Sequence, residues 1–167
     1  MNNSLSKEEI KLSVDYIWRK HLFKTHLIIW GAIELCILFL STVRGLFDRE
    51  VLEIGLSIFA MFSTVYSLIF IPIIIYYGYK MNYLVKNYSK FYMYEVVLNE
   101  VSTSYFYRGA VYYCVKFEHN GKSIYVHTSP CFSSHFLSKI KLEEYNNKKV
   151  MVLYDSDLDK VYVIKKI

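Results

Sequence analysis

Two long apolar runs follow one another almost without interruption, and they constrain this chain more than any other feature. The first extends from Leu27 to Val43 with Glu34 as its only charged residue, and the second extends from Ile54 to Tyr79 with none. A helix of about 20 mostly apolar residues crosses the roughly 30 Å hydrocarbon core of a bilayer. The polar link 44–53 is too short for a domain. The runs therefore predict two transmembrane helices, 27–43 and 54–79, that form an antiparallel hairpin.

The composition excludes several other classes of protein. Apolar residues make up 54% of the chain and charged residues 21%, which is fewer charges than in an ordinary soluble domain. Six glycines, two prolines and three cysteines exclude a collagen, a disordered tail and a disulfide scaffold. We therefore expect a small integral membrane protein.

Residues 1–26 are predicted to form an amphipathic helix before the first span. Ser6 and Glu9 have the spacing of a capping box. A helix with Trp18 on its apolar face and basic residues elsewhere is typical of the membrane interface, but the same face could pack on the protein's own β-domain. Both alternatives stay open. We expect this segment to be retained, because it lacks the pattern of a secretory signal. The apolar face comprises Ile10, Val14, Ile17, Trp18, His21 and Leu22.

Basic residues predict the orientation of the hairpin. Four precede the first span, three follow the second, and only Arg44 and Arg49 lie in the link 44–53. Lys and Arg accumulate on the cytoplasmic side of membrane proteins. We therefore expect a multi-pass protein of the cell membrane with both termini cytoplasmic and the link 44–53 outside. The flanking basic residues are Lys11, Arg19, Lys20, Lys24, Lys80, Lys86 and Lys90.

From residue 92 to 167 the apolar period changes from that of a helix to that of a strand. Asn120-Gly121 between two alternating runs is a strong signal for a two-residue hairpin turn. Six short strands in this length favour a small antiparallel β-barrel or rolled sheet. The fold class is thus a membrane α-helical hairpin plus an all-β domain, which the orientation makes cytoplasmic. The expected strands are 92–98, 103–107, 111–118, 122–128, 150–154 and 160–164, with a short helix or loop over 132–144.

Glu34 is the most informative single residue. An ionised carboxylate within a membrane helix costs about 2.5–3.5 kcal/mol on insertion scales, so such acids are candidates for function. Counting from the centres of the spans places Glu34 level with Ser63, Thr64 and Ser67 of the second run. The simplest interpretation is a protonated Glu34 that hydrogen bonds a hydroxyl there and holds the hairpin together. An oligomer contact and ion or proton handling remain as alternatives.

Aromatic and basic residues mark the exit of the second span. Tyr76, Tyr77, Tyr79 and Lys80 are predicted to anchor it in the headgroup region, as Trp18 would before the first span. Membrane lipid is therefore an expected partner.

A candidate metal site comprises His127, Cys131 and His135, which lie four residues apart. These residue types suit zinc, but Pro130 interrupts the segment, and spacing of four organises ligands only on a continuous helix. Surface histidines and a buried cysteine are the expected alternative. Serines near these histidines lack the glycine-rich context of a nucleophile elbow, and no phosphate-binding glycine loop occurs. We therefore expect no cofactor, no metal and no enzymatic activity.

The C-terminal part carries a pattern that resembles a known type of protein. The run 112–122, Tyr-Tyr-Cys-Val-Lys-Phe-Glu-His-Asn-Gly-Lys, is followed by 149–155, Lys-Val-Met-Val-Leu-Tyr-Asp. It resembles uncharacterised families of small bacterial membrane proteins that join a membrane hairpin to a small β-barrel of the OB or SH3-like kind, as in NfeD-like proteins. This chain has Ser156 where the pattern has proline. The resemblance implies a non-enzymatic, membrane-anchored accessory or interaction domain.

The leading functional hypothesis is a membrane-anchored binding module whose β-domain engages a protein partner at the membrane surface. Association with a second copy is also possible. Nucleic acid is not expected, because the net charge of +5 is not gathered into a dense basic run. The alternative is a toxin-immunity or transport-accessory protein that acts through the hairpin within the bilayer.

Overall fold

The computed structural model describes residues 5–43, 49–103, 111–133 and 140–167. The described chain divides into two units, one of residues 1–19 and 81–167 and one of residues 20–80. The expected strand 103–107 lies almost wholly outside the described residues, as do His135, residues 44–48 of the segment 44–53 and residues 134–139 of the segment 132–144. Each unit is described separately.

Three helices make up the N-terminal half: α1 (Lys7–Lys11), α2 (Val14–Val43) and α3 (Arg49–Asn87). The capping box is confirmed, because the Ser6 hydroxyl accepts the Glu9 N–H and the Glu9 carboxylate accepts the Ser6 N–H. The single helix predicted over 1–26 is wrong. α1 ends at Lys11 with Leu12 as its C-cap, and the Ser13 hydroxyl accepts the Tyr16 N–H at 3.2 Å just before α2 begins.

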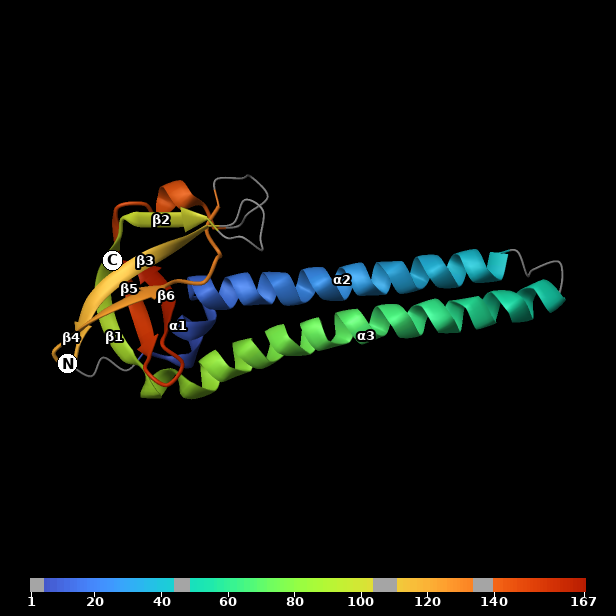
Figure 1. The fold of residues 1–167 in the computed structure, drawn as a ribbon, viewed down its shortest axis with the longest axis horizontal. Helices are drawn as coiled ribbons and strands as arrows, with labels where there is room; N and C mark the ends of the chain where they lie inside the picture. Colours follow the sequence, from blue (N-terminus) through green and yellow to red (C-terminus); the bar gives the residue numbers. More distant parts are fainter. Residues whose placement is uncertain (1–4, 44–48, 104–110, 134–139) are drawn as a thin grey trace. The chain divides into compact units, whose positions relative to one another are not determined.

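Helices α2 and α3 lie side by side and antiparallel in the unit 20–80 (Figure 1). Both are long and apolar enough to cross a membrane. A Cβ atom placed at Gly78 of α3 would lie 3.5 Å from the Phe23 ring of α2, which is an ordinary van der Waals contact, so the two helices are packed against each other at this level. Pro72 lies inside α3, where it removes one backbone hydrogen-bond donor.

The C-terminal half forms two three-stranded antiparallel sheets, with orders β1-β5-β6 and β2-β3-β4. The expected strand 92–98 has the same bounds as β1. The bounds of β3, β4, β5 and β6 lie within a few residues of the expected strands 111–118, 122–128, 150–154 and 160–164. The observed strands are β1 (Tyr92–Leu98), β2 (Glu100–Thr103), β3 (Val111–His119), β4 (Lys122–His127), β5 (Lys148–Asp155) and β6 (Lys160–Lys166).

Of the two forms expected, a small barrel or a rolled sheet, the barrel is wrong, because the described strands form two small antiparallel sheets. β1 pairs with β5 as far as Leu98, and after the single residue Asn99 the chain enters β2 and pairs with β3 instead. This change of partner divides the described strands into two sheets (Figure 1), with β1 and β6 as the edge strands of one and β2 and β4 as those of the other. The Asn120-Gly121 turn has positive φ at both residues, 51° and 74°, as a type I′ hairpin requires.

A common core lies between the two sheets. It draws on both sheets and on the start of α2, where Val14 is only 4% exposed. A second cluster joins Ile10 of α1 and Leu84 of α3 to the other face of β5 and β6. Burial of these side chains gives the β-domain most of its stability. The main core contains Val96, Leu98, Tyr113, Val115, Val126, Phe132, Val150, Val152, Val161 and Val163, and the second contains Leu153, Tyr162 and Ile164.

Candidate functional site

A polar contact joins the two long helices near the middle of the unit 20–80. The Ser67 hydroxyl donates to Glu34 Oε1 at 3.2 Å and accepts the indole N–H of Trp30 at 3.2 Å. Ser67 can do both because a hydroxyl carries one donor and two lone pairs. Trp30 precedes Glu34 by one helical turn, so the two side chains share one face of α2. The sequence reasoning placed Glu34 at this level but did not include Trp30.

The other two hydroxyl candidates behave differently. Thr64 donates to the Ala60 carbonyl of its own helix at 2.7 Å and is exposed. Ser63 is half-buried and has no hydrogen bond to Glu34 among the described residues. The interhelical contact therefore runs through Ser67.

The predicted membrane anchors divide into two groups. Tyr76 and Tyr79 are 53% and 60% exposed, and the Lys80 ammonium lies 5.6 Å from the centre of the Tyr76 ring. Tyr77 is 7% exposed and packs against His26, with ring centres 5.4 Å apart. Trp18 packs against the core of the β-domain. Tyr77 and Trp18 thus contribute to packing within the protein. For the apolar face before the first span, the burial of Ile10, Val14 and Trp18 favours packing on the β-domain over a position in the membrane interface.

The weak metal candidates are not gathered around one point in the described chain. Cys131 is fully buried in the core, and burial raises the pKa of its thiol well above the ordinary value. His127 is exposed and contacts Cys114 instead. His135 lies outside the described residues. No group of three or more ligating side chains suited to a metal occurs in the part of the chain that the structure describes.

The buried carboxylate of Asp15 links the start of α2 to the β-domain by hydrogen bonds. The sequence did not predict this contact. Asp15 is 0% exposed. Its Oδ2 accepts the backbone N–H of Val163 on β6 at 2.7 Å, and its Oδ1 accepts the hydroxyl of Ser129 just after β4. Charge-assisted hydrogen bonds of this kind are roughly twice as strong as neutral ones. Asp15 therefore links a helix to both sheets.

Arg19 completes this cluster one turn further along α2. Its guanidinium lies 3.4 Å from Asp15 Oδ1 and donates to the Ser129 hydroxyl at 3.2 Å. It also lies 5.5 Å from the centre of the Tyr162 ring. Burial raises the pKa of Tyr162, and the positive charge of Arg19 opposes that rise. The opposite charges of Arg19 and Asp15 partly offset the cost of removing both groups from water.

A second acid fastens the end of α3. Asp155, 2% exposed, accepts the Tyr83 hydroxyl at 2.9 Å and the backbone N–H groups of Asp157 and Leu158. Asp155 thus makes the local side-chain-to-backbone hydrogen bonds that favour aspartate in turns. The contact with Tyr83 adds a link to α3 that the spacing of the aspartates does not reveal.

The outer face of the β2-β3-β4 sheet carries a third polar cluster. Glu100, Cys114 and His127 are direct neighbours across the three strands. Cys114 Sγ lies 3.2 Å from His127 Nδ1. The Tyr125 hydroxyl donates to Glu100 Oε2 at 3.2 Å, and hydrogen bonds to Cys114 and Glu100 hold the pKa of Tyr125 above its ordinary value. The cluster brings a nucleophile and a base within contact distance.

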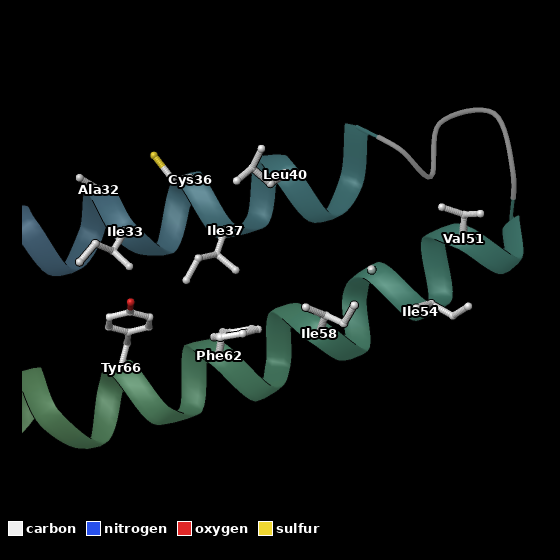
Figure 2. A pocket seen from close by; sticks show the side chains of 11 residues that line it. Ala32, Ile33, Cys36, Ile37, Leu40, Val51, Ile54, Ile58, Phe62 and Tyr66 are labelled. Atoms are coloured by element: carbon white, nitrogen blue, oxygen red, sulfur yellow. The ribbon is translucent and has the colours of Figure 1, made fainter.

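An apolar groove opens between α2 and α3 within the unit 20–80. It encloses about 750 Å³. Ile33 and Ile37 of α2 face Tyr66 and Phe62 of α3 across it (Figure 2). The described residues that line it are mostly apolar, so the groove can hold apolar groups. Its lining also includes Ala32, Cys36, Leu40, Val51, Ile54, Gly55 and Ile58.

Comparisons of the chain with protein families, with curated proteins and with solved structures find no match. The resemblance to NfeD-like proteins therefore stays a prediction from the pattern of residues.

Proposed function

We propose that this chain is a membrane-anchored, non-enzymatic binding module. In this proposal residues 27–43 and 54–79 span the cell membrane, lipid surrounds them, and both termini and the β-domain are cytoplasmic. The β-domain then engages a protein partner at the membrane surface.

One observation carries the proposal: the helices that provide the two apolar runs also provide core residues to the β-domain. Val14 and Asp15 belong to the same helix as the first run, and Leu84 belongs to the same helix as the second. The helices α2 and α3 each continue from an apolar run into residues of the β-domain. Tethering to a membrane raises the local concentration of the domain near membrane partners, so modest contacts suffice for binding.

The open edges of the sheets offer a binding surface of a known kind. β2 and β4 are paired on one side only, and they carry the exposed side chains Val101 (41%) and Tyr125 (54%). An extended segment of a partner can add to such an edge through main-chain hydrogen bonds. A strand of a second copy would fit by the same chemistry.

A second candidate function is a toxin-immunity or transport-accessory role exerted by the hairpin itself. The Glu34–Ser67 contact and the apolar groove favour it, because they place a carboxylate and a cavity within the apolar unit. Intramembrane acids are frequently functional.

A hairpin exchange separates the two functions. Residues 27–79 are replaced by an unrelated two-span hairpin, and a photo-crosslinking amino acid at Tyr125 reports protein neighbours of the β-domain in intact cells. The proposed function predicts a discrete crosslinked protein that is retained after the exchange. A crosslink to a second copy would identify self-association.

Two controls sharpen this experiment. The same crosslinker at Val163, which is fully buried, should give no partner. The single variant Glu34→Gln should leave the Tyr125 crosslink intact. Loss of the crosslink on hairpin exchange and in Glu34→Gln, with the protein still in the membrane, would reject the module and support the hairpin function.

A further inference from the structure

The contact between Cys114 and His127 has chemistry that a binding module does not need. The two residues are directly paired across β3 and β4, and the thiol sulfur lies 3.2 Å from an imidazole nitrogen. A neutral imidazole with its proton on Nε2 presents Nδ1 as an acceptor. An adjacent general base of this kind activates a thiol, since the thiolate is the nucleophile.

The surroundings hold the imidazole in place. The Tyr112 ring meets the His127 ring edge-on with centres 4.9 Å apart, and the Tyr125 ring does so at 5.9 Å. His127 itself is exposed, so Nε2 can exchange protons with water. A general base must be held within reach of the proton that it accepts, and it must then be able to release that proton to water. His127 meets both requirements.

We propose that Cys114 is a thiol-modification site that takes low-molecular-weight disulfides, with His127 as the base that receives the thiol proton. The Cys114 S–H bond breaks as Nδ1 takes the proton, and the sulfur attacks one sulfur of the disulfide. A new S–S bond forms, the old one breaks, and the departing thiolate takes the proton to become a free thiol. Cys114 is oxidised, and the small disulfide is reduced. The inference goes beyond the proposed binding function and does not depend on it.

The other two cysteines lack this arrangement. Cys131 is fully buried, and burial raises its pKa, which disfavours the thiolate. Cys36 is exposed and lines the apolar groove between the helices, where the lining residues include no histidine. Cys114 keeps 8% of its surface exposed. Cys36 and Cys131 therefore serve as internal controls for the reactivity of Cys114.

The test measures the rate of mixed-disulfide formation at each cysteine of the purified full chain with 2-hydroxyethyl disulfide, followed by mass spectrometry of its peptides. This probe is small and has no titrating group, so it adds no acid or base of its own to the reaction. At pH 7 the wild-type Cys114 should react at least about tenfold faster than Cys114 in His127→Gln, which cannot accept the proton.

Matched variants keep the outcome decisive. His119→Gln removes the imidazole at the end of β3 and should leave the Cys114 rate unchanged. His127→Phe keeps an aromatic ring beside Tyr112 and should lose rate as His127→Gln does. Cys131 must stay unreactive in every variant, which reports an intact fold. Equal Cys114 rates at pH 7 in wild type and in either folded His127 variant would overturn the proposal, as would an unreactive wild-type Cys114.

Discussion

The Oδ2 atom of Asp15 accepts the backbone N–H of Val163 at 2.7 Å across a sequence separation of 148 residues. This bond ties the start of the first long helix to the last strand of the β-domain. Since Asp15 is fully buried, its carboxylate depends on protein partners in place of water.

Removal of this carboxylate should destabilise the β-domain strongly. Asp15→Ala leaves the Arg19 guanidinium, the Ser129 hydroxyl and the Val163 N–H without their acceptor, and breaking a buried charged pair costs about 3–5 kcal/mol of unfolding free energy. Urea denaturation of the full chain in mild detergent, followed by circular dichroism, measures the change. Asp157→Ala in the exposed turn is the control and should change stability by less than about 0.5 kcal/mol. A loss that small for Asp15→Ala would contradict the structure.

The link between α3 and Asp155 should have a smaller effect. Tyr83→Phe removes one hydroxyl and keeps the ring, while Asp155 still accepts two backbone N–H groups. We expect a loss of about 1 kcal/mol in the same assay. Tyr92→Phe, at an exposed tyrosine of β1, serves as the comparison and should have no measurable effect. An equal effect of the two variants would show that the Tyr83 hydroxyl contributes nothing.

Within the hairpin, Ser67→Ala should weaken helix packing because it removes both the bond to Glu34 and the bond from Trp30. Interhelical hydrogen bonds in membrane proteins contribute about 0.6–1.7 kcal/mol, so a loss of about 1 kcal/mol is expected. Unfolding of the full chain in bicelles by sodium dodecyl sulfate gives the value. Ser57→Ala is the matched control, since the Ser57 hydroxyl bonds only the Glu53 carbonyl of its own helix among the described residues. Equal losses in the two variants would argue against the interhelical contact.

Alkaline pH should destabilise the fold through Cys131. Burial raises the pKa of this thiol above its ordinary value of 9.0. As pH rises, Cys131 therefore loses its proton in the unfolded chain before it does so in the folded chain. The contribution of the thiol to the free energy of unfolding is present below about pH 9 and falls at higher pH, by at most about 1.4 kcal/mol per pH unit. The same burial raises the pKa of Tyr113 to about 12.

The difference in unfolding free energy between wild type and Cys131→Ala, measured from pH 7 to 10.5, isolates the thiol from the tyrosines. The wild type should lose more stability than the variant over this range. Parallel pH profiles for the two proteins would refute the assignment.

The proposed membrane orientation of the hairpin is tested by labelling single cysteines in intact cells with an impermeant maleimide. Asp48→Cys lies in the link between the spans, and Ser156→Cys lies in the exposed turn after β5. With both termini cytoplasmic, only position 48 should react. Permeabilised cells, in which both should react, provide the control. Reaction at position 156 alone would place the β-domain outside the cell.

Local pattern was enough to predict the elements whose interactions are local. Alternation of apolar side chains gave β1 with its observed bounds, and Asn120-Gly121 gave the turn between β3 and β4. The level of Glu34 relative to Ser67 followed from the geometry of an antiparallel hairpin. Ser13, followed by Asp15 in the first helical turn, is a recognisable N-terminal signal that could have revealed the break before α2.

Interactions between distant segments were not predictable in this way. The partners of Asp15 lie 114 and 148 residues away, and an acid in the first turn of a helix is ordinarily solvated. At Asn99 the chain stops pairing with β5 and begins to pair with β3. The positions of these partner strands depend on residues distant in the sequence, which the alternation of neighbouring side chains does not encode. The pairing of Cys114 with His127 required the register of β3 and β4.

The distance in sequence between Asp15 and Val163 also has a consequence for biosynthesis. A ribosome delivers residue 163 only 148 residues after residue 15, so the carboxylate of Asp15 has no backbone partner on β6 while the intervening residues are made. Both apolar runs leave the ribosome before that partner exists. Insertion of the hairpin can therefore precede closure of the β-domain, and the first helix receives its final attachment last.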